Sequence, residues 1–161
     1  MRPAVGESGR GEGREAGRVL RLSSAAGEWI RAHAQRDYPN ECCGLMVGRR
    51  DGEAWQVEYA RPARNLTVER AGDRFLLDPA DFVRVDREAR GSGLDIIGVY
   101  HSHPDHPAQA SETDRENAWP ALAYLIVGVR QGRAEEWRVW EYDGEIFHER
   151  NLARSPRGTE D

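Results

Sequence analysis

Apolar positions recur along the chain at helical spacing in two segments. After Ser23 or Ser24, either of which can cap a helix, four apolar residues follow at roughly that spacing and predict a helix ending near "YPN": Ala26, Trp29, Ile30 and Ala34. A second helix is predicted over "PADFVRVDREARGSG", because Pro79 suits a first helical turn and two glycines end the segment. The candidate core contacts of this helix are Phe82, Val83 and Val85.

Shorter apolar runs, bounded by turn residues, predict strands. The run "LDIIGVY" (residues 94–100) is nearly continuous, which is typical of a strand covered on both faces. Asp143-Gly144 is a hairpin signal between the last two strands. The other candidate strands are "VLRLS", "ECCGLMVGRR", "AWQVEYARPA", "LAYLIVGVR", "AEEWRVWEYD" and "EIFHER". Helices combined with a largely antiparallel sheet predict an α/β or α+β fold.

The length of 161 residues fits a single domain. Residues 1–17 mix glycine with charge and offer little to bury, so we predict a disordered tail there, a domain over 18–150 and a flexible tail over 151–161. No apolar run approaches the roughly 20 residues that cross a bilayer, so no membrane segment is expected. The adjacent cysteines Cys42 and Cys43 cannot form an ordinary bridge to each other and indicate a reducing, cytoplasmic setting.

Charge and composition exclude two classes of function. The net charge of -5 argues against a general nucleic-acid binder, because affinity for phosphates needs a basic face. All 23 basic residues are arginine, which removes any lysine nucleophile or Schiff base. The chemistry has to come from other side chains.

The segment "HSHPDHPAQASETD", residues 101–114, concentrates groups that bind protons and metals directly after a buried strand. His101 and His103 are two residues apart, so strand alternation points both rings to one face. Asp114 adds a carboxylate, and two imidazoles with one carboxylate leave the fourth position of a zinc ion open to water, as in catalytic sites. The sequence therefore suggests an open zinc site of the catalytic type.

Two further residues have both an ordinary and a catalytic interpretation. Ser111 can cap a short helix with Asp114 in its first turn, and such a capping box is common in proteins without a metal. A zinc hydrolase also needs a proton shuttle, and Glu41, which begins the strand "ECCGLMVG", is the best candidate, although it is equally an ordinary strand end.

Together, Glu41 and the pattern HxHPx6SxxD resemble the JAMM motif of the MPN-domain metallopeptidases. The resemblance runs from about residue 18 to residue 150. It implies an MPN/JAMM-like mixed, largely antiparallel sheet flanked by helices. It also implies one Zn²⁺ per chain held by His101, His103 and Asp114, with Glu41 as general base and Ser111 stabilising the oxyanion. A carbonyl polarised in this way does need a donor where negative charge develops.

Asp105 and His106 are rival ligands, but "PDHP" reads as a turn that projects into solvent, where these two residues could instead border a substrate groove. A thiolate site at Cys42 and Cys43 is not favoured, because strand alternation separates them and neither belongs to a CxxC pair. We expect Trp119 in the core. The HxE and PCxxC signature of zinc deaminases is absent.

The chain resembles the short bacterial and archaeal members of this family, because only about 60 residues separate Glu41 from His101. Those forms are similar to enzymes that trim the C-terminus of small ubiquitin-fold sulfur-carrier proteins after a Gly-Gly tail. The resemblance therefore implies a peptidase or isopeptidase for a ubiquitin-like partner. A peptidase of broader specificity, a deubiquitinase-like enzyme and a non-catalytic MPN scaffold are the alternatives. Whether the chain forms a homodimer stays open.

Overall fold

The computed structural model describes residues 18–67, 72 and 74–154. The predicted tail over 1–17 lies outside these residues. No helix in the described part is long and apolar enough to span a membrane.

Within the described residues, seven strands form one mixed sheet that closes into a barrel in the order β1-β3-β2-β4-β5-β6-β7. The strand bounds are β1 Val19–Leu22, β2 Cys43–Asp51, β3 Ala54–Ala63, β4 Asp95–Pro104, β5 Ala123–Arg130, β6 Arg133–Tyr142 and β7 Phe147–Arg154. The pairs β1·β3, β1·β7 and β4·β5 are parallel, and the other four pairs are antiparallel. The predicted mixed, largely antiparallel sheet is confirmed.

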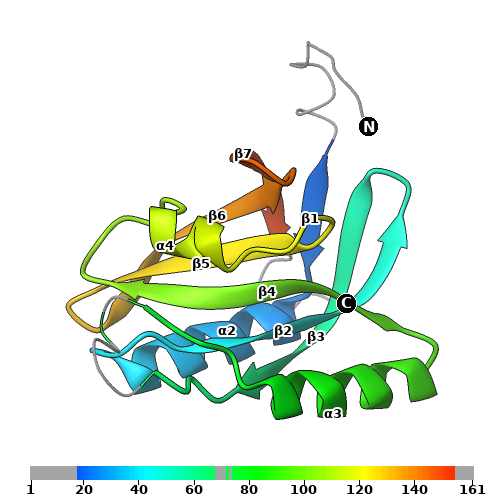
Figure 1. Cartoon of the computed structure of the whole chain (residues 1–161), viewed down its shortest axis with the longest axis horizontal. Helices are drawn as coiled ribbons and strands as arrows, with labels where there is room; N and C mark the ends of the chain where they lie inside the picture. Colours follow the sequence, from blue (N-terminus) through cyan, green and yellow to red (C-terminus); the bar gives the residue numbers. More distant parts are fainter. Residues whose placement is uncertain (1–17, 68–71, 73, 155–161) are drawn as a thin grey trace.

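Three helices accompany the sheet in the described residues: α2 (Ser24–Asp37), α3 (Pro79–Gly91) and α4 (Glu112–Glu116) (Figure 1). Ser23 caps α2 by accepting a hydrogen bond from the Ala26 N–H, as the sequence predicts. Asp78 caps α3, and Pro79 occupies its first turn. Both long helices are therefore placed by local signals that the sequence carries.

Each face of the sheet buries its own hydrophobic cluster. On one face, Ile30 of α2 packs with strand residues such as Leu125 and Val127. On the other face, Val85 of α3 packs with Val99 and Ile126. Because neighbouring strand residues point to opposite faces, residues 99, 101 and 103 of β4 share the α3 face. The candidate metal ligands of β4 therefore lie on the side of the sheet that α3 covers.

Strand β7 extends further than the sequence analysis predicts. Asn151 and Leu152 pair with β1, and the pairing continues to Leu22 opposite Arg154. Residues 151–154 thus belong to the closed sheet and not to a flexible tail, because β1 supplies backbone partners that are distant in sequence. The rest of the expected tail, 155–161, lies outside the described residues.

Candidate metal centre

Strand β4 places two buried imidazoles beside each other. His101 and His103 are both 1% exposed, and their Nε2 atoms lie 3.3 Å apart. The expectation that strand alternation directs both rings to one face is confirmed. Both imidazole rings are therefore buried, and their Nε2 atoms point toward each other.

A capping box at the start of α4 orients the third group. The Ser111 Oγ accepts a hydrogen bond from the Asp114 N–H at 3.0 Å, and the Asp114 Oδ2 accepts one from the Ser111 N–H at 2.9 Å. The two reciprocal bonds hold the Asp114 carboxylate in one orientation. The capping box that the sequence suggests is present, and it faces the histidines of β4.

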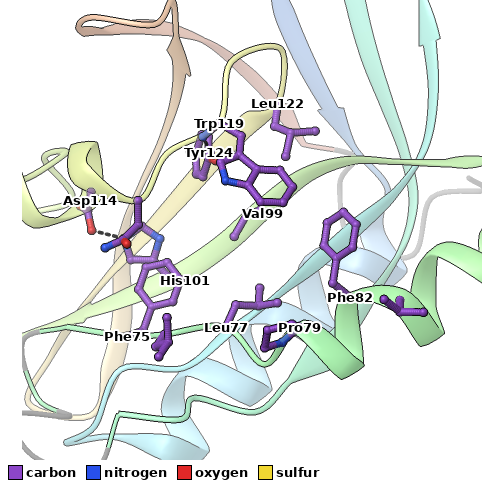
Figure 2. Close-up of a pocket in the computed structure, with 13 residues that line it drawn as sticks. Phe75, Leu77, Pro79, Phe82, Val99, His101, Asp114, Trp119, Leu122 and Tyr124 are labelled. Carbon is purple, nitrogen blue, oxygen red and sulfur yellow. Dashed lines mark hydrogen bonds and ion pairs between the residues drawn. The ribbon is translucent and has the colours of Figure 1, made fainter.

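The three groups converge at the Asp114 carboxylate. Figure 2 shows the side chains of His101 and Asp114 facing each other, and His101 Nε2 lies 3.1 Å from Asp114 Oδ1. His103 Nε2 lies 3.1 Å from Asp114 Oδ2. Ligands at zinc bond lengths and tetrahedral angles are about 3.3 Å from one another. The separations of 3.1 to 3.3 Å among these atoms therefore fit a zinc ion bound between them.

The hydrogen bonds of the imidazoles agree with a ligand role. His103 donates from Nδ1 to the Pro107 carbonyl oxygen at 2.7 Å, which leaves the Nε2 lone pair available to a metal. His101 Nδ1 has no hydrogen-bond partner among the described residues, but the Phe75 ring stacks on His101 at 4.4 Å between centroids. Both rings are thus held in place with Nε2 directed at Asp114.

Charge states also suit a zinc site. Burial lowers the pKa of His101 and so favours its neutral form, the form that binds metals. Burial acts to raise the pKa of Asp114, but the charge and hydrogen bonds of His101 and His103 outweigh it and hold that pKa well below its usual range. The donor set is therefore two imidazoles and an ionised carboxylate, which zinc accepts in open sites.

Glu41 lies beside this set and is 2% exposed. One of its carboxylate oxygens lies within 4.8 Å of a ring nitrogen of His103, a distance that a single water can bridge. Its backbone is fixed from two sides, since Asn65 Nδ2 donates to the Glu41 carbonyl oxygen at 3.1 Å and the neighbouring Cys42 N–H donates to Ser102 Oγ at 2.8 Å. Glu41 is therefore brought to the candidate site although it is far from His101 in sequence.

The two residues considered as alternative metal ligands, Asp105 and His106, lie in different surroundings. Asp105 is exposed, accepts hydrogen bonds from the Tyr38 hydroxyl and the Gln131 N–H, and belongs to neither metal-binding group among the described residues. The His106 ring, by contrast, stacks on His103 at 4.2 Å between centroids. Cys42 is buried, burial raises the pKa of its thiol to about 12, and it belongs to neither metal-binding group among the described residues.

An apolar groove opens from the metal centre. It has a volume of about 430 Å³ and runs from His101 and Asp114 to Trp119, between α3 and the segment before β5 (Figure 2). Val83 and Trp119 line it and are 54% and 58% exposed, so the expectation that they are core residues is wrong. Apolar residues in a sequence do not by themselves show whether they are buried in the core or line an open groove.

Two residues at the site were not recognised in the sequence. Phe75 covers His101, and Asn65 links Glu41 to the backbone of Arg74 and Leu76. Both come from the segment between β3 and α3, where a polar stretch without periodicity gives no indication of a role. The one available signal at position 65 was the residue type, because asparagine side chains often form hydrogen bonds with nearby backbone groups in loops.

Comparisons with known proteins show what this chain is similar to. The family model described as prokaryotic homologs of the JAB domain matches residues 24–142. A desampylase from Haloferax volcanii is 36% identical over 83% of this chain and 95% of its own length. A probable TtuB-protein conjugate cleaving protease from Thermus thermophilus is 34% identical, over 82% of this chain and 86% of that protein. A CysO-cysteine peptidase from Mycobacterium tuberculosis is 30% identical, over 73% and 80%.

Proposed function

Because the chain belongs to the family of prokaryotic homologs of the JAB domain, we propose that it is a zinc-dependent peptidase or isopeptidase for a small ubiquitin-like sulfur-carrier protein. The bond hydrolysed is the one after the partner's C-terminal Gly-Gly. The observation that carries the proposal is the convergence of His101, His103 and Asp114 at separations that suit tetrahedral zinc. The names of the three relatives support the substrate class.

The proposed reaction divides the work among five residues. His101, His103 and Asp114 would hold zinc, and a zinc ion there would supply a Lewis acid that polarises the scissile carbonyl and lowers the pKa of a water to about 7. The Glu41 carboxylate would take a proton from the attacking water as the water oxygen bonds to the carbonyl carbon. Glu41 then delivers the proton to the leaving nitrogen as the C–N bond breaks.

Ser111 completes the proposed site. Its Oγ already accepts the Asp114 N–H, so its own O–H proton is left to donate to the carbonyl oxygen as negative charge develops there. Ser111 thus accepts a hydrogen bond in the capping box through its oxygen and would donate one in catalysis through its hydroxyl proton. The ordinary and the catalytic interpretations of Ser111 are compatible.

The groove beside the site suits the C-terminal tail of a partner. An extended tail laid along it reaches His101 and Asp114 at one end, and its walls are mostly apolar side chains such as Phe82 and Trp119. A slender Gly-Gly pair can pass between these walls and the metal ligands. We keep the cytoplasm as the proposed compartment, since both cysteines are free and buried.

The test is intact-mass spectrometry of a ubiquitin-fold sulfur carrier incubated with the zinc-loaded protein. Two substrates are compared: a carrier with a residue after Gly-Gly and a carrier joined through Gly-Gly to a lysine side chain. We expect cleavage after Gly-Gly that a zinc chelator abolishes. Glu41→Gln is expected to keep its zinc and lose turnover, because glutamine cannot carry the proton.

Three outcomes separate the alternatives. Cleavage of unrelated peptides at a similar rate would replace the proposal with a broad-specificity peptidase. Cleavage of ubiquitin conjugates in preference to the carrier would favour a deubiquitinase-like enzyme. A protein that binds one zinc and cleaves none of these substrates would favour the non-catalytic scaffold.

A further inference from the structure

A second group of metal-binding side chains lies next to the proposed catalytic ligands. One donor atom each of Glu41, His103 and His106 lies within 4.8 Å of the others. His106 takes no part in the proposed reaction, and Glu41 takes part only as a proton carrier. The second group is therefore not explained by the hydrolytic site alone.

His106 is held in the orientation of a metal ligand. Its Nδ1 donates to the Pro104 carbonyl oxygen at 2.9 Å, which leaves the Nε2 lone pair available. The same arrangement, a ring nitrogen bonded to a nearby backbone carbonyl, orients His103 through Pro107. Stacking on His103, with 22° between the ring planes, fixes the His106 ring further. His106 is thus oriented much as its neighbour His103 is.

His103 cannot serve both groups at once. Its Nε2 lies among the three convergent atoms of the catalytic set, and its Nδ1 is bonded to Pro107. When the catalytic ion is bound, a second ion has Glu41 and His106 as its side-chain ligands and needs solvent for the rest. A carboxylate and an imidazole are donors that zinc accepts, but two protein ligands bind it more weakly than three.

We propose that Glu41 and His106 form a second, weaker zinc site beside the catalytic one, and that excess zinc inhibits hydrolysis by binding there. Inhibition follows because a Glu41 carboxylate that binds an ion no longer accepts a proton from water. The binding site stands on the geometry alone, whereas its inhibitory consequence rests on the proposed function.

Counting zinc tests the site without any substrate. Metal-free protein is titrated with Zn²⁺ in competition with a chromophoric chelator. We expect two ions for the native chain, the second bound more weakly, and only one for His106→Ala. Removal of a ligand should weaken the second ion by at least about 10- to 100-fold. The remaining tight ion also shows that the variant is folded around the catalytic ligands.

A surface histidine provides the matched control. His148 Nε2 lies 2.7 Å from Asp143 Oδ2, so it is also an imidazole beside a carboxylate, but far from the catalytic ligands in sequence. His148→Ala is expected to keep both ions. The proposal is overturned if His106→Ala still binds two ions, or if His148→Ala loses the second.

Inhibition is measured as a ratio. For each protein, the cleavage rate at excess zinc is divided by its own rate at one equivalent. We expect this ratio to fall at least about 10-fold for the native chain and to stay near one for His106→Ala. An equal fall in both proteins would refute the inhibitory role. If no substrate is cleaved, the proposed function fails, while the zinc count still decides the site.

Discussion

At the scale of single residues, the side chains of one short segment, residues 101–114, converge as the spacing of the motif predicts. His101, His103 and Asp114 converge as strand alternation and the capping box suggest. Phe75 and Asn65 could not be anticipated, because their roles depend on how the segment between β3 and α3 folds over Glu41 and His101. The sequence predicts which face of a strand or helix a side chain occupies, but it does not predict which side chains a loop brings into contact.

Ser111 gives a prediction that separates catalysis from capping. Ser111→Ala removes both the acceptor for the Asp114 N–H and the proposed oxyanion donor. We expect a loss of about 1 kcal/mol in the free energy of unfolding from the cap, and a kcat lower by about 100-fold or more. Urea denaturation and single-turnover cleavage measure the two effects. Normal turnover with reduced stability would make Ser111 purely structural.

At the scale of secondary structure elements, the register of β2 against β4 decides whether Glu41 reaches the histidines. Gly44 pairs with Tyr100, and a Cβ at position 44 would lie 2.3 Å from atoms of the Tyr100 side chain. The Tyr100 hydroxyl lies 2.7 Å from His33 Nδ1, so the ring has little freedom to move. The close approach of the two strands therefore depends on glycine.

Gly44→Ala should accordingly destabilise the fold. We expect a loss of about 1 to 3 kcal/mol in the free energy of unfolding, measured by urea denaturation, because the added methyl overpacks the strand pair. Gly91→Ala is the matched control, since a Cβ at Gly91 meets nothing within 4 Å. Equal effects of the two substitutions would show that the Gly44 contact is unimportant.

Asn65 connects two elements of the site and gives a second prediction at this scale. Its amide nitrogen donates to the carbonyl oxygens of Glu41 and Arg74, and its Oδ1 accepts the N–H groups of Thr67 and Leu76. Asn65→Asp keeps the shape but replaces the donor with an oxygen. We therefore expect Glu41 to shift and kcat to fall by up to about 100-fold, with zinc retained.

The control for Asn65→Asp is Asn40→Asp, which adds the same charge next to Glu41 at an exposed position. A positioning role predicts that kcat falls in Asn65→Asp and not in Asn40→Asp, with KM little changed. If both variants lose activity equally, the added charge is the cause. If neither does, Asn65 does not position Glu41.

At the scale of the whole molecule, the fold class was predictable but the closure of the sheet was not. Alternating and continuous apolar runs identified the strands, and the mixed, largely antiparallel sheet is present. The parallel pairing of β1 with β7 joins the two ends of the domain, and no local signal reports a partner more than a hundred residues away. The end of the domain was therefore placed too early, at residue 150.

The pairing of β7 with β1, which closes the sheet, leads to a prediction about the C-terminal strand. A chain ending at Arg150 loses residues 151–154, which pair with β1, whereas a chain ending at Arg154 keeps them. We expect the shorter chain to unfold at a clearly lower temperature, because β1 loses a neighbour and Leu152, which packs against the core, is removed. Thermal unfolding of the two truncated chains compares them directly. Identical midpoints would mean that the pairing contributes nothing to stability.

The proposed function depends on one zinc ion that His101, His103 and Asp114 would hold to make this chain a hydrolase for a ubiquitin-like partner. The most direct measurement is the initial rate of cleavage after Gly-Gly as Zn²⁺ is added to the metal-free protein. We expect no cleavage without zinc and a rate that rises in proportion to zinc up to one ion per chain. Cleavage by the zinc-free protein, or a His103→Ala variant that reaches the same rate at one equivalent, would contradict it.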